Sequence, residues 1–381
     1  MKICIVHNAY GIFSGEEAVV MAHSALFREH GCEVVEFRRS SEELRGLPGM
    51  VKGFFCGIAN PVSVHAFASM LDAEKPDIVH IHNLYPLINP AILPEATKRN
   101  IPVVMTVHNF RLFCPNGLFF AGNTNCEYCA QHESVIACLV RNCLQSKCKT
   151  LGYVLRHIKT NHFYWENVDR FLCLTQFQRQ KLVHYGTPAL KCRVLPNFID
   201  GDWLRKARAS SDGSGDYVAY MGRLSKEKGI DLILEAAQEL PNIPFKIAAE
   251  NSVEAFRMPI PPNVEFVGYL TGDALFEFLR QARIHLMASR CYESFPTSLP
   301  QAMSLGIPEI VPAGGPMESI IGDSGLTFTP GNLAQTIRRL YGDKDALQRC
   351  REAALRRIEE YTPEKYWDLY SAVVGNLLHR G

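Results

Sequence analysis

Two cations stand close together in the second half of the chain, within the run YVAYMGRLSKEKG at 217–229. Arg223 follows an apolar run, and Lys228 stands just before the next helical pattern. Because the free amides at the start of a helix also attract anions, both side chains can bind one polyanion there. A diphosphate fits this chemistry. When the two cations are taken alone, a solvated charged loop is the simpler interpretation.

A carboxylate and an amide follow a later apolar run, in the segment ASRCYESFPTSLPQAMSLGIP at 288–308. Glu293 lies in the loop after the expected strand. Phe295, Pro296 and Thr297 lead into a helix with exposed amides, and Gln301 lies about one turn along it. Polar groups on both sides of free amides suit a ligand that presents a sugar, a phosphate and a ribose in sequence.

Two further loops connect an expected strand to an expected helix. The first, NAYGIFSGEEAVV at 8–20, reaches its helix at Gly15 and Glu16, and the second, GGPME at 314–318, contains Gly315 and Glu318. Free amides at such a helix start accept an anion or a sugar hydroxyl. The first loop lacks the dinucleotide-binding spacing, and an ordinary turn explains it equally well.

Histidines end two of the expected strands, in HIHN at 80–83 and MTVHNF at 105–110. Imidazole is largely neutral at pH 7, so a histidine at the end of a strand can donate or accept a hydrogen bond near a substrate. His80 lies inside its strand, which favours a structural role. His108 lies at the strand tip and is the functional candidate.

Cysteines gather in one segment, where Cys114 precedes four candidate zinc ligands: Cys126, Cys129, Cys138 and Cys143. Thiolates in this number can enclose a tetrahedral zinc ion of structural role. The spacing is irregular and matches no strict zinc template. Reduced cysteines within an insertion are therefore the favoured interpretation, and zinc is the alternative.

Short β-branched runs alternate with amphipathic helical stretches along the chain, as in parallel βαβ units. The first series of expected strands comprises Lys2–His7, Val34–Arg38, Asp77–His82, Pro102–His108, Arg170–Leu174 and Arg193–Leu195. The second comprises Tyr217–Met221, Phe245–Ala249, Val264–Gly268, Ile284–Ala288, Pro308–Val311 and Leu326–Phe328. We therefore expect an α/β protein of two doubly wound domains, with a linker at 197–216 and a last helix at 363–378 that carries an apolar stripe.

Length and charge exclude several classes of function. The chain has 381 residues, which favours two domains over one. Its 40 Lys and Arg nearly balance 39 Asp and Glu, for a net charge of +1, so no global basic field attracts nucleic acid. No apolar stretch reaches the ~18 residues that span a bilayer. Thirteen cysteines without an export signal indicate a reducing cytoplasm.

The motifs together resemble a known family. Six segments occur in the order in which this family has them. They are the first loop, KPDIVHIHN at 75–83, TVHNFRLFCPNG at 106–117, PNF at 196–198, Gly222-Arg223 with Lys228-Gly229, and the Glu293 segment through IP at 307–308. The chain resembles family 4 retaining glycosyltransferases over essentially its full length. The resemblance implies the GT-B fold, in which two facing Rossmann-like domains border a central cleft.

The resemblance also implies the domains and their roles. Residues 1–198 form an N-terminal acceptor-binding domain with a cysteine-rich insertion at 114–148. Residues 199–362 form a nucleotide-sugar-binding domain, and 363–381 form a helix that packs back across the junction. The implied activity is retaining transfer of a sugar from a nucleoside diphosphate to a glycan or lipid-linked acceptor, as in cell-surface polysaccharide synthesis.

Site roles follow from the same resemblance. Arg223, Lys228 and amides at 295–297 stabilise the departing diphosphate, so no metal or other cofactor is required. Glu293 holds the sugar hydroxyls, and His108 contacts the transferred sugar. The donor-binding residues are Gly15, Glu16, Phe295, Pro296, Thr297, Gln301, Gly315 and Glu318.

The sequence departs from the family pattern at two positions. The family has a second Glu where this chain has Gln301, which keeps an acceptor oxygen and loses a charge. Replacing a charge-assisted hydrogen bond to the ribose by a neutral one implies a roughly tenfold weaker donor. Glu309 stands where the family usually has an apolar strand residue, and the sequence offers no explanation for it.

Other interpretations stay open at this point. A catalytically degenerate homologue that binds a nucleotide sugar or glycan without turnover is the main alternative. The set of Arg223, Lys228 and Glu293 argues against a GT-B enzyme of other chemistry, such as a nucleotide-sugar epimerase. Asp200-Gly201-Asp202 has the spacing of a metal motif from another glycosyltransferase fold, but it lies in the expected linker, which disfavours a metal.

The expected partners are a nucleotide sugar and a glycan or lipid-linked acceptor, without nucleic acid. The segment Leu44–Phe55 contains Arg45, Lys52, Phe54 and Phe55. This apolar and basic composition suits peripheral contact with the inner face of a membrane, and a buried helix explains it nearly as well. We therefore expect a cytoplasmic protein with an optional membrane contact.

Overall fold

The computed structural model describes the chain apart from residues 11–14, 45, 211–214, 250–258 and 379–381. Parts of the expected first loop and linker, and residue 45 of the expected membrane segment, lie outside the described residues. The chain divides into two compact units. The first comprises Met1–Ala121, Cys126–Asn197 and Tyr366–Gly381, and the second comprises Gly122–Asn125 and Phe198–Lys365.

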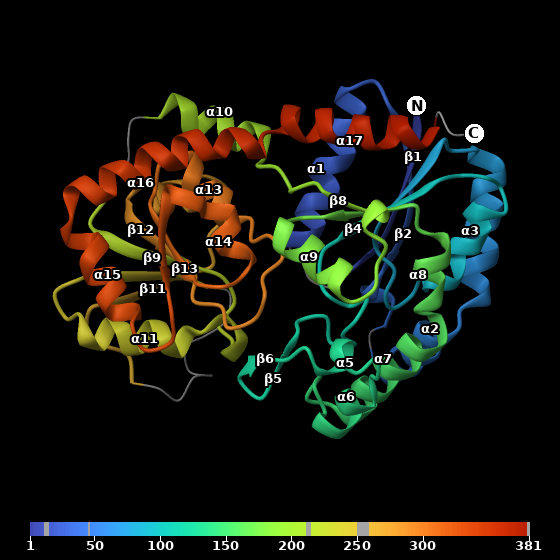
Figure 1. Ribbon diagram of the computed structural model, residues 1–381, viewed down its shortest axis with the longest axis horizontal. Coiled ribbons are helices and arrows are strands. Elements are labelled where there is room, and N and C mark those ends of the chain that lie inside the picture. The colour runs from blue at the N-terminus through green and yellow to red at the C-terminus, as the bar shows by residue number, and fades with distance from the viewer. Residues whose placement is uncertain (11–14, 45, 211–214, 250–258, 379–381) are drawn as a thin grey trace. The chain divides into compact units, whose positions relative to one another are not determined.

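The first unit is built on a six-stranded parallel sheet in the order β2-β1-β3-β4-β7-β8 (Figure 1). Its strands are β1 (Lys2–Ala9), β2 (Glu33–Ser40), β3 (Ile78–Asn83), β4 (Val103–Val107), β7 (Arg170–Cys173) and β8 (Cys192–Val194). Every residue of β3 and β4 is buried, as expected for parallel strands with helices on both faces of the sheet.

Helices of the first unit surround this sheet. They are α1 (Gly15–Glu29), α2 (Gly46–Ile58), α3 (Pro61–Glu74), α4 (Leu93–Thr97), α7 (Lys147–Thr160), α8 (His162–Asn167) and α9 (Gln176–His184). Between β4 and α7 lie four short elements: β5 (Phe120–Ala121), β6 (Thr124–Asn125), α5 (Tyr128–Gln131) and α6 (Ile136–Arg141). The cysteine-rich segment is therefore an insertion after β4, at the carboxyl end of the sheet.

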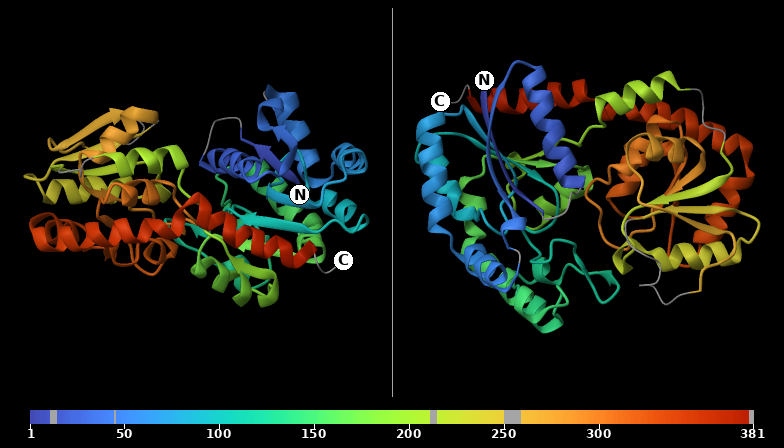
Figure 2. Two further views of the ribbon diagram at one scale, coloured as in Figure 1. Left: turned by 90° about the horizontal axis from the view of Figure 1, so that it is seen from above. Right: turned by 180° about the vertical axis from the view of Figure 1, so that it is seen from behind.

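The second unit has its own six-stranded parallel sheet, in the order β11-β10-β9-β12-β13-β14 (Figure 2). The strands are β9 (Tyr217–Met221), β10 (Phe245–Ala248), β11 (Val264–Gly268), β12 (Ala282–Leu286), β13 (Glu309–Pro312) and β14 (Gly325–Phe328). The helices are α10 (Gly201–Ala209), α11 (Ile230–Glu239), α12 (Gly272–Arg280), α13 (Ser298–Ser304), α14 (Pro316–Ile321), α15 (Leu333–Gly342) and α16 (Lys344–Arg357).

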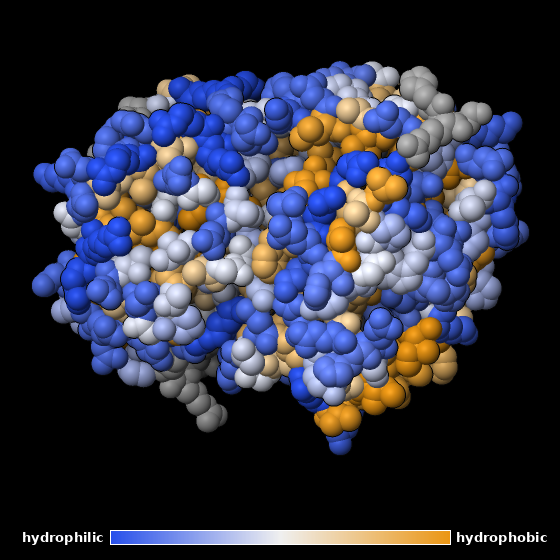
Figure 3. All heavy atoms as spheres, viewed as in Figure 1, coloured by the Kyte–Doolittle hydropathy of each residue, from blue (hydrophilic) through white to orange (hydrophobic). Residues whose placement is uncertain are grey.

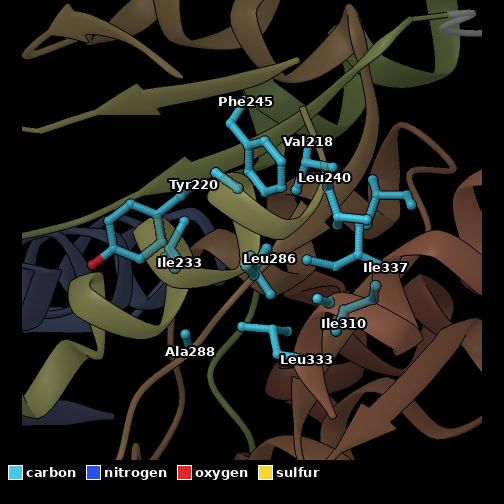
Figure 4. Close-up of a cluster of buried hydrophobic side chains, with 14 of the residues drawn as sticks. Val218, Tyr220, Ile233, Leu240, Phe245, Leu286, Ala288, Ile310, Leu333 and Ile337 are labelled. Carbon is cyan, nitrogen blue, oxygen red and sulfur yellow. The ribbon is translucent and has the colours of Figure 1, made fainter. Parts of the chain in front are cut away.

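One face of this sheet packs into a continuous apolar core. Strand residues including Val218, Tyr220, Phe245, Leu286 and Ile310 meet Ile233 of α11 and Leu333 and Ile337 of α15 (Figure 4). Side chains at alternate positions of β9 point to this same face, which explains why Val218 and Tyr220 both enter the cluster. The core fixes the sheet, and thereby the loops that leave its strands.

The last helix, α17 (Pro363–Leu378), carries an aromatic face. From Tyr366 onward it belongs to the first unit, where it packs on α1. The Tyr370 ring stacks on Phe27 with the centroids 4.6 Å apart, and the Trp367 ring stacks on His30 at 4.2 Å. The apolar stripe expected from the sequence is thus used for packing within the chain.

The fold class expected from the sequence is confirmed. Each of the twelve expected strands is present, with its ends within two residues of the expected positions. The expected linker is wrong in one respect, because residues 201–209 form α10. Asp200 begins this helix by accepting a hydrogen bond from the Trp203 amide at 2.9 Å, which is the usual role of an N-terminal cap.

Glu309 has a partner that the sequence did not reveal. Residues His285 and Glu309 stand side by side on the paired strands β12 and β13, and both are completely buried. His285 Nδ1 lies 2.6 Å from Glu309 Oε2. Burial raises the pKa of Glu309 to about 7, although the imidazole opposes this shift. The folded carboxyl therefore keeps its proton up to about pH 7, whereas in the unfolded chain it loses that proton near pH 4.5.

This difference predicts a pH-dependent stability. Between the unfolded value of 4.5 and about 7 the folded protein retains the Glu309 proton, so stability falls as the pH rises through that window. We expect wild-type protein to lose roughly 1–3 kcal/mol of unfolding free energy across it, and Glu309→Gln to lose less. Urea unfolding at a series of pH values measures this. Exposed Glu352→Gln serves as the control, and parallel profiles for wild type and Glu309→Gln would contradict the assignment.

Candidate functional site

The strand order of the second unit identifies where its ligand site lies. The chain starts at β9 in the middle of the sheet, extends to β11 at one edge, and then continues from β12 to the other edge. The loops after β9 and β12 therefore diverge from neighbouring strand ends. In doubly wound sheets ligands bind at this switch point, beyond the carboxyl ends of the strands. Arg223 and Lys228 follow β9, and Glu293 follows β12.

A glycine allows the two loops to approach each other. Gly229 has a φ of 70°, in the left-handed region, and a Cβ at this position would lie 2.0 Å from the Ala288 carbonyl oxygen. Only glycine fits such a contact with backbone. Arg290 joins the same loops from the other side: its guanidinium binds both carboxylate oxygens of Asp231, at 2.5 and 2.8 Å. Lys228 is thereby held against the loop that carries Glu293.

Lys228 and Glu293 form an ion pair at the switch point. Lys228 Nζ donates to Glu293 Oε1, and both side chains are largely buried, with 17% and 16% of their surface exposed. Ser289 Oγ donates to the same carboxylate oxygen at 2.9 Å. Burial disfavours both charges, but the mutual attraction and hydrogen bond outweigh it, so the pKa of Lys228 is raised and that of Glu293 is lowered. The pair is therefore charged.

Arg223 lies near this pair and remains available to a ligand. Its side chain is 64% exposed, and its guanidinium lies 3.7 Å from Glu227. Tyr220 donates a hydrogen bond to the Arg223 carbonyl oxygen at 3.0 Å, which links the loop to the sheet. The positive charge of Arg223 contributes to the lowered pKa of Glu293. The structure thus brings the three residues together as the sequence predicts.

The segment after Glu293 differs in detail from the prediction. Helix α13 begins at Ser298, after Thr297, instead of at Pro296. The Phe295 side chain packs against the Tyr361 ring, at a centroid distance of 5.3 Å, so it offers a ligand only its backbone. Gln301 lies within the helix, and its side-chain oxygen is buried without a hydrogen-bond partner. An acceptor oxygen is thus present where the family has a carboxylate.

The loop before α14 uses one of its expected ligand groups internally. Gly315 immediately precedes this helix, as predicted. The Gly314 amide donates to Glu318 Oε2 at 2.7 Å, so the carboxylate closes its own loop. This contact supports a positioning role for Glu318.

Histidines of the first unit form a buried group at the ends of β1, β3 and β4. His82 Nδ1 lies 2.8 Å from His108 Nε2, and His80 Nε2 lies 2.8 Å from Thr106 Oγ1. His23 of α1 packs beside them, with its ring centroid 5.1 Å from that of His82. Burial lowers the pKa of His108 to about 3, so its imidazole is neutral. His80 has the structural place expected for it.

Glu16 lies at the start of α1, one residue after Gly15, which is the first residue of that helix. Tyr10 Oη donates to Glu16 Oε2 at 3.2 Å. Burial raises the pKa of Glu16 to about 7, opposed by the nearby Arg111 guanidinium. Sequence reasoning did not single out Arg111, although its motif carries part of the family resemblance. The position of Arg111 in the loop after β4 was the signal that could have identified it as a site residue.

The cysteine-rich insertion encloses a small cavity of about 270 Å³. All four predicted zinc ligands line it, namely Cys126, Cys129, Cys138 and Cys143, together with Cys114. The thiols suit zinc in type. Within the part of the chain that the structure describes, however, the trio whose ligand atoms lie within 4.8 Å of one another is His23, His80 and His82, and the cysteines form no such trio. The structural zinc stays a prediction, and no step below depends on it.

Asp200 and Asp202 do not point to a shared metal. Asp200 caps α10, and Asp202 pairs with Arg205 while 82% of its side chain is exposed. Their contacts agree with the sequence argument against a metal at this motif.

Comparison with protein families gives two matches that follow each other along the chain. Residues 13–203 match the model of Glycosyltransferase Family 4, and residues 203–357 match that of glycosyl transferases group 1. A comparison with curated proteins finds no match.

Solved structures resemble the chain over its full length. Sucrose-phosphate synthase from Thermosynechococcus elongatus is 14% identical with a TM-score of 0.69, and the match covers 100% of both chains. HepE of Anabaena in complex with UDP-glucose is 14% identical with a TM-score of 0.64, covering 99% of this chain and 100% of that one. WaaG, a glycosyltransferase of lipopolysaccharide biosynthesis, is 15% identical with a TM-score of 0.64, covering 98% and 99%. Two parallel α/β units, the arrangement at the switch point and both family matches lead to one conclusion: the chain belongs to glycosyltransferase family 4 and has the GT-B fold.

Proposed function

We propose that the protein transfers a sugar from a nucleoside diphosphate to a glycan or lipid-linked acceptor, with retention of configuration at the anomeric carbon. The observation that carries this proposal is the Lys228–Glu293 ion pair at the switch point, with Arg223 beside it. A neighbouring structure holds UDP-glucose, which makes a uridine diphosphate sugar the first donor to test.

The proposed chemistry uses the cations to stabilise the leaving group. The bond between the anomeric carbon and the diphosphate oxygen breaks, and negative charge grows on the diphosphate. The acceptor hydroxyl oxygen bonds to the anomeric carbon on the same face of the sugar, and its proton passes to the departing diphosphate. Arg223 and the ammonium of Lys228 interact more strongly with this charge than with the intact donor, which lowers the barrier. Because these groups supply the positive charge, the proposed step uses no metal ion. The backbone amides of Phe295, Thr297 and Gly315 complete the donor contacts.

Glu293 has two roles in this proposal. Its carboxylate holds Lys228 in place, and its remaining acceptor capacity binds hydroxyls of the donor sugar. Gln301 accepts a hydrogen bond from the nucleotide ribose through its unpartnered oxygen. His108, as a neutral imidazole, contacts the transferred sugar, and Glu16 binds near it at the start of α1. In this proposal residues 199–362 bind the nucleotide, whereas residues 1–198 bind the acceptor and also contact the transferred sugar through His108 and Glu16.

A binding protein without turnover is the second candidate, favoured by Gln301 in place of a carboxylate. The two candidates differ in one measurable respect. A working site hydrolyses its donor slowly without acceptor and releases free sugar of retained configuration. A degenerate site binds the donor and releases nothing.

Removal of Arg223 tests the donor site. We expect UDP to raise the melting temperature of the wild-type protein, because a ligand of the folded state stabilises it. Arg223→Ala removes a charge-assisted contact, so its affinity for UDP should fall at least tenfold. Arg208→Ala is the matched control, since this exposed cation of the same unit pairs with Glu359. An unchanged UDP response in Arg223→Ala would disprove the role given to Arg223.

Because Lys228 and Glu293 form an ion pair, we expect the effects of replacing them on the unfolding free energy not to be additive. Lys228→Met leaves the Glu293 carboxylate largely buried without its cation, which should cost about 2–4 kcal/mol of unfolding free energy. Adding Glu293→Gln removes the stranded charge and should recover part of that loss. Urea unfolding of both single variants and the double variant measures the coupling. Strict additivity would show that the two side chains do not interact.

Membrane contact is a further part of the proposal, at the surface formed by α2, α6 and α7. Helix α7 packs against both α2 and α6. These helices expose Val51, Phe55, Ile136, Val140, Leu151, Leu155 and Ile158, and they also expose Lys52, Arg141, Lys147, Lys149 and Lys159. Figure 3 shows apolar side chains gathered over α6 and α7. None of the three helices contains an acidic residue, so the surface complements anionic lipid headgroups.

Within the described residues no single helix has the length and apolarity to cross a membrane; the segments Val51–Ile58 and Pro61–Glu74 meet these criteria only as a pair bent by 61°.

Vesicle binding tests this surface. We expect cosedimentation with phosphatidylglycerol vesicles and little with phosphatidylcholine vesicles. Replacing Phe55 and Ile158 together by Ser removes two apolar side chains and should weaken binding at least tenfold. Val62→Ser provides the control, because Val62 is also exposed but lies on α3. Equal binding by the double variant and the control would contradict the assignment.

A further inference from the structure

A second cavity lies in the first unit, beside His108. It encloses about 360 Å³, its mouth included, and Asn83, Asn109, Arg111 and Arg156 are among the residues that line it. Arg111 comes from the loop after β4, and Arg156 comes from the middle of α7. Two guanidinium groups from separate elements thus meet in one cavity next to a proposed catalytic imidazole.

Both guanidiniums are withdrawn from solvent with hydrogen-bonding capacity unused. Arg156 is only 4% exposed, although it lies on a helix, where arginine normally reaches water. Its Nη2 donates to Tyr164 Oη at 3.0 Å. The Nε atoms of Arg111 and Arg156 are buried and have no hydrogen-bond partner. Each Nε is therefore a donor that the protein places in this region and does not satisfy.

The two guanidiniums also share an aromatic neighbour. The guanidinium carbons of Arg111 and Arg156 lie 5.8 and 4.9 Å from the centroid of the same Tyr85 ring. Arg111 also lies over the Tyr153 ring, at 5.4 Å. Aromatic faces attract cations, but less strongly than an anion does in a desolvated site. The rings orient the guanidiniums and supply no full negative charge.

Among the described residues, no carboxylate neutralises this pair of charges at contact distance. The cavity lining contains no Asp or Glu, and in that same part of the chain neither arginine forms an ion pair within 4 Å. The acidic group that acts on Arg111 is Glu16, which already accepts a hydrogen bond from Tyr10. Glu16 and the Tyr10 hydroxyl raise the pKa of Arg111 and keep it charged, but the lining of the cavity itself offers no carboxylate, and a bound anion would supply that contact.

We infer that the acceptor carries an oxyanion, a phosphate or a carboxylate, which binds in the cavity that Arg111 and Arg156 line. Planar guanidinium groups recognise such oxygens with paired hydrogen bonds, and the unused Nε donors supply part of them. An anion held there places the attached acceptor beside His108, where the sugar is to be transferred. This inference rests on the proposed function and adds the chemical class of its acceptor.

Inorganic phosphate is the probe that tests this site. The melting temperature of the full-length protein is followed against phosphate concentration, with ionic strength held constant by NaCl and with saturating UDP to occupy the donor site. We expect phosphate to stabilise the wild type. The half-saturating concentration should rise at least tenfold in Arg111→Gln and in Arg156→Gln, because each loses a charge-assisted contact.

Three comparisons make the result specific. Arg193→Gln, a partly buried arginine of β8 that does not line the cavity, should respond like the wild type. Arg156→Lys keeps the charge without the planar fork and should show an intermediate response, which covers the case that Arg156→Gln does not fold. Repeating the titration with glucuronate identifies the source: tighter phosphate binding indicates a phosphorylated acceptor, and tighter glucuronate binding indicates an acidic sugar.

The outcomes separate this inference from the proposed function. If phosphate stabilises the wild type and both glutamine variants at the same concentrations, the anion site is refuted, whatever UDP does. If UDP fails to stabilise the wild type, the donor proposal fails, and the phosphate titration repeated without UDP still decides whether Arg111 and Arg156 bind an anion.

Discussion

Lys228 and Glu293 hold opposite charges where neither would be stable alone, and the second unit is arranged to keep them together. Their loops leave adjacent parallel strands, β9 and β12, at the one place where the sheet changes direction. Gly229 allows the loops to touch, Arg290 ties them, and Ser289 satisfies the carboxylate. A buried ion pair is weak evidence for stability, and its place at the ligand edge of the sheet makes these charges candidates for function. The proposed donor chemistry depends on this pair.

The first unit presents a contrasting electrostatic environment. Its histidines are buried and neutral, and its two cavity arginines have no contacting carboxylate among the described residues. The second unit therefore balances the buried charge of this pair internally, whereas the lining of the cavity beside His108 carries positive charge and no carboxylate. That difference is the physical reason for assigning an anionic group to the acceptor. A bound anion supplies the negative charge that the lining of the cavity beside His108 lacks.

Much of the fold could be predicted from the sequence because buried parallel strands are short, β-branched and regularly spaced. The location of Arg223, Lys228 and Glu293 could also be predicted, since loops after parallel strands lie at the ligand edge of the sheet, whereas the roles of these residues stay predictions. The helix at 201–209 was missed, because the Ser- and Gly-rich residues that follow it suggested a linker, although Asp200 is a typical capping residue. The capping residue Asp200 was therefore a better guide to this helix than the Ser- and Gly-rich composition of the residues that follow it.

Contacts between distant segments could not be predicted. Glu309 appeared unexplained because the register between β12 and β13, which pairs it with His285, cannot be derived from the sequence of either strand alone. The sequence analysis did not single out Arg156, because nothing in the sequence of α7 shows that the helix face carrying this residue is buried. The cysteines illustrate the converse: their clustering in sequence did bring them to one cavity, but clustering does not fix the distances that a metal requires.

A crystal structure of the protein with UDP tests the central claim most directly. The account predicts that oxygens of the diphosphate lie about 3 Å from the Arg223 guanidinium and the Lys228 ammonium, with the Lys228–Glu293 contact preserved. A nucleotide bound elsewhere in the second unit, with its diphosphate touching neither cation, would contradict it.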